Sequence, residues 1–163
     1  MALVTKISCQ VRTANESSAS TDGFPYLGIG GREFRLDTSN DDFQAKANFT
    51  YIFGDGANVL FPERNDPRRD FLIDTTRLDE FPVYIRFDPE IGNDHWRLRF
   101  AMVLVYEEGD FVRAVYFSQT RAEGIWLGRT AGKFLHLSRF RGFGDGRILS
   151  KGDLTTLSAQ LAL

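Results

Sequence analysis

The segment from Trp96 to Val105 constrains the fold more than any other part of the sequence, because it is apolar on both faces of an extended chain. Alternate residues of a β-strand point to opposite faces, so a period of two indicates a strand. One face carries Trp96, Leu98, Phe100, Met102 and Leu104, and the other begins with Arg97 and Arg99 and turns apolar at Ala101, Val103 and Val105. A strand that is apolar on both faces lies centrally, between two layers or under a loop. The segment therefore predicts a layered β-structure.

Further short strands are expected along the whole chain. Leu3, Ile7, Cys9 and Val11 share one face of the first segment, and alternation recurs in residues 49–53 and 83–87. The 163 residues include 15 phenylalanines, a residue type that is enriched in strands. Helical spacing occurs only near the end, where Asp153 is placed to cap a short helix. We expect an all-β, antiparallel β-sandwich in residues 1–138 and a C-terminal extension with a short helix in residues 139–163.

The charge distribution disfavours a nucleic-acid partner. The formal net charge is −2, whereas nucleic-acid-binding domains usually carry a large basic excess. Residues 121–152 nevertheless hold seven basic and only two acidic side chains. This region mixes cations with aromatic rings, and we expect the following residues in it to contact an anionic membrane or a protein partner: Trp126, Arg139, Phe140, Arg141 and Phe143. A solvated tail and single-stranded nucleic-acid binding are the alternatives for this stretch.

The sequence contains no recognisable catalytic constellation. Its two histidines, His95 and His136, have no metal-ligand spacing with each other or with Cys9. Neither a G-x-S-x-G nucleophile motif nor a phosphate-binding glycine loop that opens a helix occurs. We therefore predict a protein that is not an enzyme. No apolar run typical of a signal peptide or a transmembrane helix is seen, so the expected location is cytoplasmic or peripheral to a membrane.

Acidic and amide side chains gather in the loops between the expected strands. Asp22 precedes the strand that begins at Phe24, and Asp88 directly follows Phe87. Asn93 and Asp94 directly precede Trp96. Oxygen ligands on flexible loops suit Ca²⁺, which takes about six to eight of them. Asp and Asn also favour turns because of their local hydrogen bonds, so turn formation is the alternative explanation.

Several short motifs carry a resemblance to a known family. They are Thr21-Asp22-Gly23 before Tyr26-Leu27-Gly28-Ile29-Gly30; Phe61, Glu63, Arg64, Asp70 and Phe71; Leu78, Val83, Ile85, Arg86 and Asp88; and Asn93-Asp94-His95-Trp96-Arg97-Leu98. In order and spacing they resemble the signature of PLAT domains, the β-sandwich modules of lipoxygenases, animal lipases and polycystins. The similarity spans about residues 4–137, although the loop after Phe61 is longer than in the family pattern.

The resemblance implies a sandwich of eight strands in two four-stranded sheets. It also implies calcium-assisted binding to membranes or lipid, or docking to another protein. By position in the family motifs, the residues that would contribute to calcium sites or shape those loops are Asp22, Glu63, Asp88, Asn93 and Asp94. The tryptophan of the family corresponds to Trp96, which we expect in the core.

The main hypothesis is a non-enzymatic PLAT-type module that binds membrane lipids, assisted by calcium. A protein-interaction or self-assembly module without metal is the alternative, with a homo-oligomer formed through the C-terminal segment as one version of it. A small hydrolase with an acidic cleft is a third hypothesis.

Overall fold

The computed structural model describes residues 2–141, 150, 155 and 156 of the chain. They form ten strands and two short 3₁₀ helices, in the order β1 (Lys6–Thr13), η1 (Ser17–Ala19), β2 (Phe24–Ile29), β3 (Arg32–Arg35), β4 (Asn48–Gly54), η2 (Thr75–Glu80), β5 (Tyr84–Asp88), β6 (His95–Glu107), β7 (Phe111–Phe117), β8 (Ile125–Gly128), β9 (Phe134–His136) and β10 (Ser138–Arg139). Within this part of the chain, no helix is long and apolar enough to cross a membrane.

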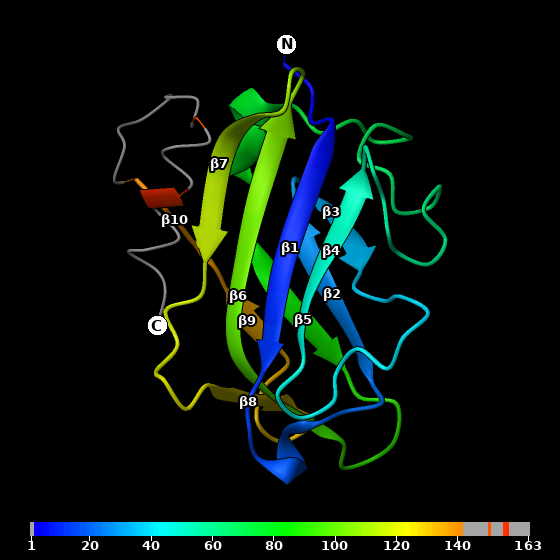
Figure 1. Cartoon of the computed structure of the whole chain (residues 1–163), viewed down its shortest axis with the longest axis vertical. Helices are drawn as coiled ribbons and strands as arrows, with labels where there is room; N and C mark the ends of the chain where they lie inside the picture. The colour runs from blue at the N-terminus through cyan, green and yellow to red at the C-terminus, as the bar shows by residue number, and fades with distance from the viewer. Residues whose placement is uncertain (1, 142–149, 151–154, 157–163) are drawn as a thin grey trace.

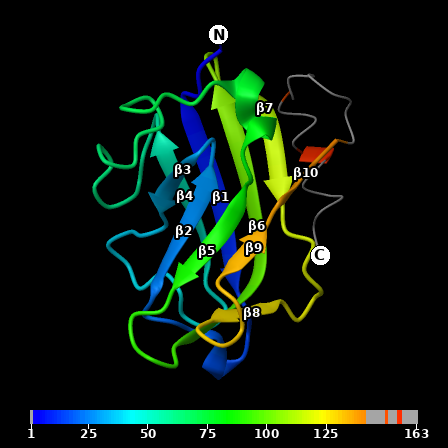
Figure 2. The same cartoon turned by 180° about the vertical axis from the view of Figure 1, so that it is seen from behind.

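The strands form two antiparallel sheets that face each other as a sandwich (Figures 1 and 2). One sheet has the order β10-β7-β6-β1-β4, with β8 also paired to β6, and the other has the order β3-β2-β5-β9. The predicted all-β sandwich is therefore confirmed, but the predicted number of eight strands is wrong. The long strand β6 explains part of the difference, because His95–Leu98 pairs with β8 while Met102–Glu107 pairs with β7.

A β-bulge in β6 explains why this strand is apolar on both faces. Arg12 of β1 pairs with Phe100 and Thr13 pairs with Leu98, so Arg99 has no partner on β1. An extra residue of this kind exchanges the two faces of a strand. Trp96 and Leu98 are buried before the bulge, and Ala101, Val103 and Val105 are buried after it. The predicted central position of the strand is confirmed, since β6 lies between β1 and β7.

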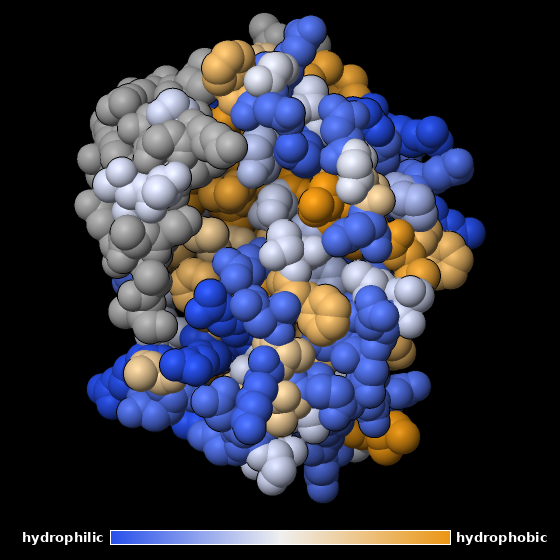
Figure 3. All heavy atoms as spheres, in the orientation of Figure 1, coloured by the Kyte–Doolittle hydropathy of each residue, from blue (hydrophilic) through white to orange (hydrophobic). Residues whose placement is uncertain are grey.

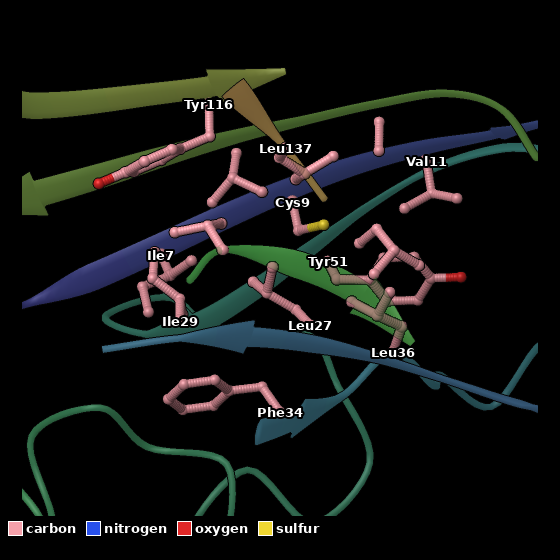
Figure 4. Close-up of a cluster of buried hydrophobic side chains, with 14 of the residues drawn as sticks. Ile7, Cys9, Val11, Leu27, Ile29, Phe34, Leu36, Tyr51, Tyr116 and Leu137 are labelled. Atoms are coloured by element: carbon pink, nitrogen blue, oxygen red, sulfur yellow. The ribbon is translucent and has the colours of Figure 1, made fainter. Parts of the chain in front are cut away.

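The core lies between the two sheets. Figure 4 shows Ile7, Cys9 and Val11 of β1 and Leu27 and Ile29 of β2 pointing into the same space. Burial raises the pKa of the Cys9 thiol, which behaves here as a small apolar side chain.

Trp96 is fully buried at one end of this core, as expected from the sequence. Its ring packs edge-on against Phe43, with the centroids 5.3 Å apart, and is tilted against Phe87 at 6.0 Å. The indole Nε1 donates a 3.0 Å hydrogen bond to Thr13 Oγ1, so the polar atom of this large side chain is satisfied inside the core.

A smaller apolar cluster lies on the outer face of the six-stranded sheet, which Figure 3 shows as hydrophobic patches among hydrophilic side chains. Val112 and Val115 are buried there, with Met102, Leu104, Tyr106 and Phe140 packed against them. The chain reaches this face through β10, which pairs with β7. The expected domain boundary between residues 138 and 139 falls inside β10. Most of the expected C-terminal helix lies outside the described residues.

Candidate functional site

Four of the five predicted calcium ligands gather at one end of the sandwich, which we call the acidic end. It consists of the loops 14–23, 37–47 and 89–94, next to the residues where β1 ends and β6 begins (Figure 1). Asp22, Asp88, Asn93 and Asp94 all lie here. Glu63 does not, because its loop follows β4, whose last residue Gly54 pairs with Lys6 at the opposite end of β1. The five residues cannot share one ion.

The loops of the acidic end enclose a hollow of about 170 Å³ lined by several carboxylates. Two of these carboxylates, those of Asp37 and Asp42, are engaged by protein donors. Asp42 accepts from the backbone and side chain of Thr38 at 2.8 and 2.6 Å, and Asp37 pairs with Arg35 at 2.7 Å. Burial raises the pKa of Asp37, with Arg35 opposing this shift. In the described part of the chain, no group of three or more His, Cys, Asp or Glu side chains is placed to hold a metal ion. Calcium binding at the acidic end stays a prediction.

A second hollow at the same end is larger and differently lined. It is a shallow, open depression of about 580 Å³ bordered by Ser18, Ser20, Asn93, Asp94, His95, Trp126 and Ala131. The structure therefore brings two predicted metal ligands together with one predicted membrane-contact residue. We call this space the Trp126 hollow.

Short hydrogen bonds fix the walls of the Trp126 hollow. Thr21 Oγ1 donates to Asp94 Oδ2 at 2.5 Å and accepts from the backbone N–H of Gly23 at 2.9 Å. His95 Nδ1 donates to the carbonyl of Asn93 at 2.5 Å, and its Nε2 lies 3.0 Å from Thr130 Oγ1. These bonds tie the loops 14–23 and 89–94 to the turn after β8.

Gly128 allows this arrangement because it pairs with His95 across the β6–β8 ladder. A Cβ atom at position 128 would lie 2.5 Å from Cδ2 of the His95 ring and 2.9 Å from a backbone oxygen. Thr21 belongs to the motif before Phe24, but its contact with Asp94 does not follow from spacing along the chain. The contact of Gly128 with His95 does not follow from spacing either.

Apolar side chains are exposed on the loop and the strand that supply Asn93, Asp94 and Trp126 to the hollow. Ile91 in the loop 89–94 is 76% exposed, and Ile125, next to Trp126, is 37% exposed. Neither isoleucine stands out in the sequence, because isolated apolar residues in loops are common on protein surfaces.

The basic and aromatic residues predicted near the C-terminus lie elsewhere. Arg139 and Arg141 both pair with Asp79 of η2, at 2.5 and 3.7 Å. Phe140 packs edge-on against Phe117 at 6.2 Å, on the outer face of the six-stranded sheet. Phe143 lies outside the described residues. Of the four predicted contact residues that the structure describes, only Trp126 lies at the acidic end.

The opposite end of the sandwich carries a separate apolar cluster, which the sequence did not predict as a surface. Phe71 is 80% exposed, Phe61 is 60% exposed and Leu72 is 51% exposed. The loop that holds them is well ordered by hydrogen bonds, because Arg32 Nη1 donates to the carbonyls of Asp66 and Arg69 at 2.9 and 3.0 Å. We call these three residues the Phe71 cluster.

Known structures share this fold. The sequence matches no protein-family model and no curated protein. The structure matches the alpha toxin of Clostridium absonum with a TM-score of 0.53 and 20% identity, covering 84% of this chain and 32% of that one. It matches the Clostridium perfringens alpha-toxin from an avian strain with a TM-score of 0.52 and 18% identity, covering 83% of this chain and 32% of that one.

A lipoxygenase variant, Delta413-417:GS LOX in complex with arachidonate, matches with a TM-score of 0.50 and 14% identity, covering 94% of this chain and 19% of that one. The chain thus spans about a third of the toxin chains and a fifth of the lipoxygenase chain. At these identities the matches establish the fold, and the PLAT-type sandwich that the motifs resemble is confirmed.

Proposed function

We propose that this chain is a non-enzymatic module that binds lipid surfaces through its acidic end. The observation that carries the proposal is the exposure of two apolar side chains, Ile91 and Ile125, on the loop and the strand that also supply residues to the Trp126 hollow. Placing an exposed isoleucine in an apolar environment contributes about 1.5–3 kcal/mol. A few such contacts give reversible attachment, and a partly buried tryptophan is suited to the boundary between headgroups and acyl chains.

Calcium assistance is a finer prediction and is kept apart from this proposal. Among the described residues no three acidic side chains are grouped to hold an ion, so we expect a bound Ca²⁺ to take further oxygen ligands from a lipid headgroup. Calcium is therefore a separate variable in the experiment.

Co-sedimentation with vesicles tests the proposal. Vesicles of phosphatidylcholine, with and without phosphatidylserine, are pelleted with the protein in the presence of Ca²⁺ or a chelator. Ile91→Ser should reduce the pelleted fraction several-fold, because about 1.5–3 kcal/mol of apolar transfer is lost. Phe71→Ser is the matched control, since it removes an exposed apolar side chain from the opposite end.

The outcomes separate the possibilities. Equal pelleting of Ile91→Ser and the unmodified protein would show that the acidic end does not bind the vesicles. No pelleting on any vesicle, with or without Ca²⁺, would end the lipid proposal. Pelleting that needs Ca²⁺ and phosphatidylserine together would support the calcium prediction as well.

The Phe71 cluster favours a second candidate function, self-association without metal. Exposed aromatic side chains on an ordered loop are typical of the centre of protein interfaces. Sedimentation velocity over a range of concentrations tests it. A concentration-dependent dimer that Phe71→Ser abolishes and Ile91→Ser preserves would support this function, and a monomer at all concentrations would exclude it.

A further inference from the structure

The Trp126 hollow has a lining that selects for one kind of ligand charge. It combines an aromatic ring, that of Trp126, with the carboxylate of Asp94, and none of the described residues that line it is a lysine or an arginine. An indole face attracts cations through its quadrupole, and a nearby carboxylate adds a full opposite charge. A hollow of this composition favours a cation over an anion.

The carboxylate of Asp94 is held in place through one of its two oxygens. Thr21 donates to Oδ2 of Asp94, and the side chain is half-buried at the wall of the hollow. A fixed, partly desolvated carboxylate interacts more strongly with a cation than a fully exposed one does. The position of Asp94 thus contributes charge without the entropic cost of ordering the side chain.

The indole is also held in place, and it already accepts one cation. The guanidinium carbon of Arg97, the cross-strand partner of Trp126, lies 5.4 Å from the ring centroid. Arg97 is ion-paired with Glu16 and is not among the residues that line the hollow. Arg97 therefore contacts the indole without lining the hollow.

A primary ammonium ion donates three hydrogen bonds and so needs three acceptors. The ring nitrogens of His95 do not supply them, because they are engaged with Asn93 and Thr130. A quaternary ammonium ion has no N–H donors and makes its contacts through apolar methyl groups and diffuse charge. An aromatic ring beside a carboxylate suits this chemistry.

We propose that the Trp126 hollow binds a quaternary ammonium group of the choline type, with the ring of Trp126 and the carboxylate of Asp94 as its two contacts. This inference rests on the proposed lipid-binding function, because choline headgroups are a surface on which the exposed Ile91 and Ile125 would also be buried. The same chemistry is present in free phosphocholine, so the experiment includes both sources.

Binding of phosphocholine in solution tests the inference without a membrane. Ligand-observed NMR detects the trimethylammonium protons directly, with phosphoethanolamine and inorganic phosphate as comparison ligands. Saturable binding of phosphocholine, and weaker binding of the two comparison ligands, is expected. Asp94→Asn and Trp126→Ala should each weaken it about fivefold or more, and Trp126→Phe should weaken it less. Asp94→Asn keeps an acceptor for Thr21 and so tests charge without removing the hydrogen bond.

Vesicle pelleting then separates the inference from the proposed function. Phosphocholine binding that both variants weaken, without any pelleting, supports the hollow as a choline site and overturns the lipid function. Pelleting with no phosphocholine binding, or with Asp94→Asn and Trp126→Ala unchanged on phosphatidylcholine vesicles, overturns the inference and leaves the lipid function standing. Equal binding of inorganic phosphate also overturns it, because an anion would then be the recognised group.

Discussion

The hydrogen bond between Trp96 and Thr13 connects the core to the acidic end, and its contribution to stability follows from its burial. Trp96 is 0% exposed and Thr13 is 3% exposed, so water cannot replace either partner. Thr13→Val keeps the shape of the side chain and removes the acceptor. The indole N–H is then buried without a partner, which costs about 1–3 kcal/mol.

A double-mutant cycle isolates this bond. Thr13→Val is measured in the unmodified protein and again in a Trp96→Phe background, which has no N–H to satisfy. Urea unfolding followed by far-ultraviolet circular dichroism gives the free energy of unfolding for all four proteins, independently of tryptophan fluorescence. We expect a loss of about 1–3 kcal/mol in the first background and less than about 0.5 kcal/mol in the second.

Thr13→Ser is the control, since it retains the hydroxyl group and should lose only the contribution of a methyl group, about 1 kcal/mol. An equal loss for Thr13→Val in both backgrounds would refute the argument. It would mean that the cost comes from packing or strand propensity rather than from an unsatisfied indole.

Three further predictions concern other parts of the sandwich. Hydrogen bonds from Arg86 lower the pKa of Glu33. They therefore stabilise the folded protein above about pH 4.5, and this stabilisation is lost as the pH falls through the lowered pKa. Glu33→Gln should flatten this part of the profile of unfolding free energy against pH. Asn58 pairs with the free edge of β4 through its side chain, and Asn58→Ala should increase self-association in sedimentation experiments. Gly54 and Gly56 both have positive φ, but only at Gly54 would a Cβ atom lie 2.2 Å from a backbone carbonyl oxygen. Gly54→Ala should therefore lower the free energy of unfolding by at least about 1 kcal/mol more than the control Gly56→Ala.

Local alternation was sufficient to predict most of the strands. The pattern around Ile7, Cys9 and Val11 predicted a half-buried strand, and these three residues are buried in β1. The number of strands could not be predicted in the same way. Short elements such as β8 and β10 exist because the long strands β6 and β7 offer them edges to pair with, and this depends on the tertiary structure.

The candidate site could be predicted only where its residues are close in sequence. Asn93 and Asp94 precede β6 directly, so their joint position followed from the strand prediction. The contact of Asp94 with Thr21 joins residues 73 positions apart, and no local pattern contains it. Glu63 was grouped with them by motif alone, and the direction of β4 places it at the other end.

The bulge at Arg99 allows the one strand β6 to contribute residues both to the core and to the acidic end. After the bulge, the residues of β6 that face the core are odd-numbered. Without the bulge, the same alternation would also turn Arg97 and Arg99 into the core. Burying an unpaired guanidinium costs several kcal/mol. The bulge instead buries Trp96 and places Arg97 on the outer face, opposite Trp126 in the β8 register and paired with Glu16. The position of the Trp126 ring is therefore a consequence of how the core is packed, so a change that removes the bulge would disturb the hollow without touching its lining.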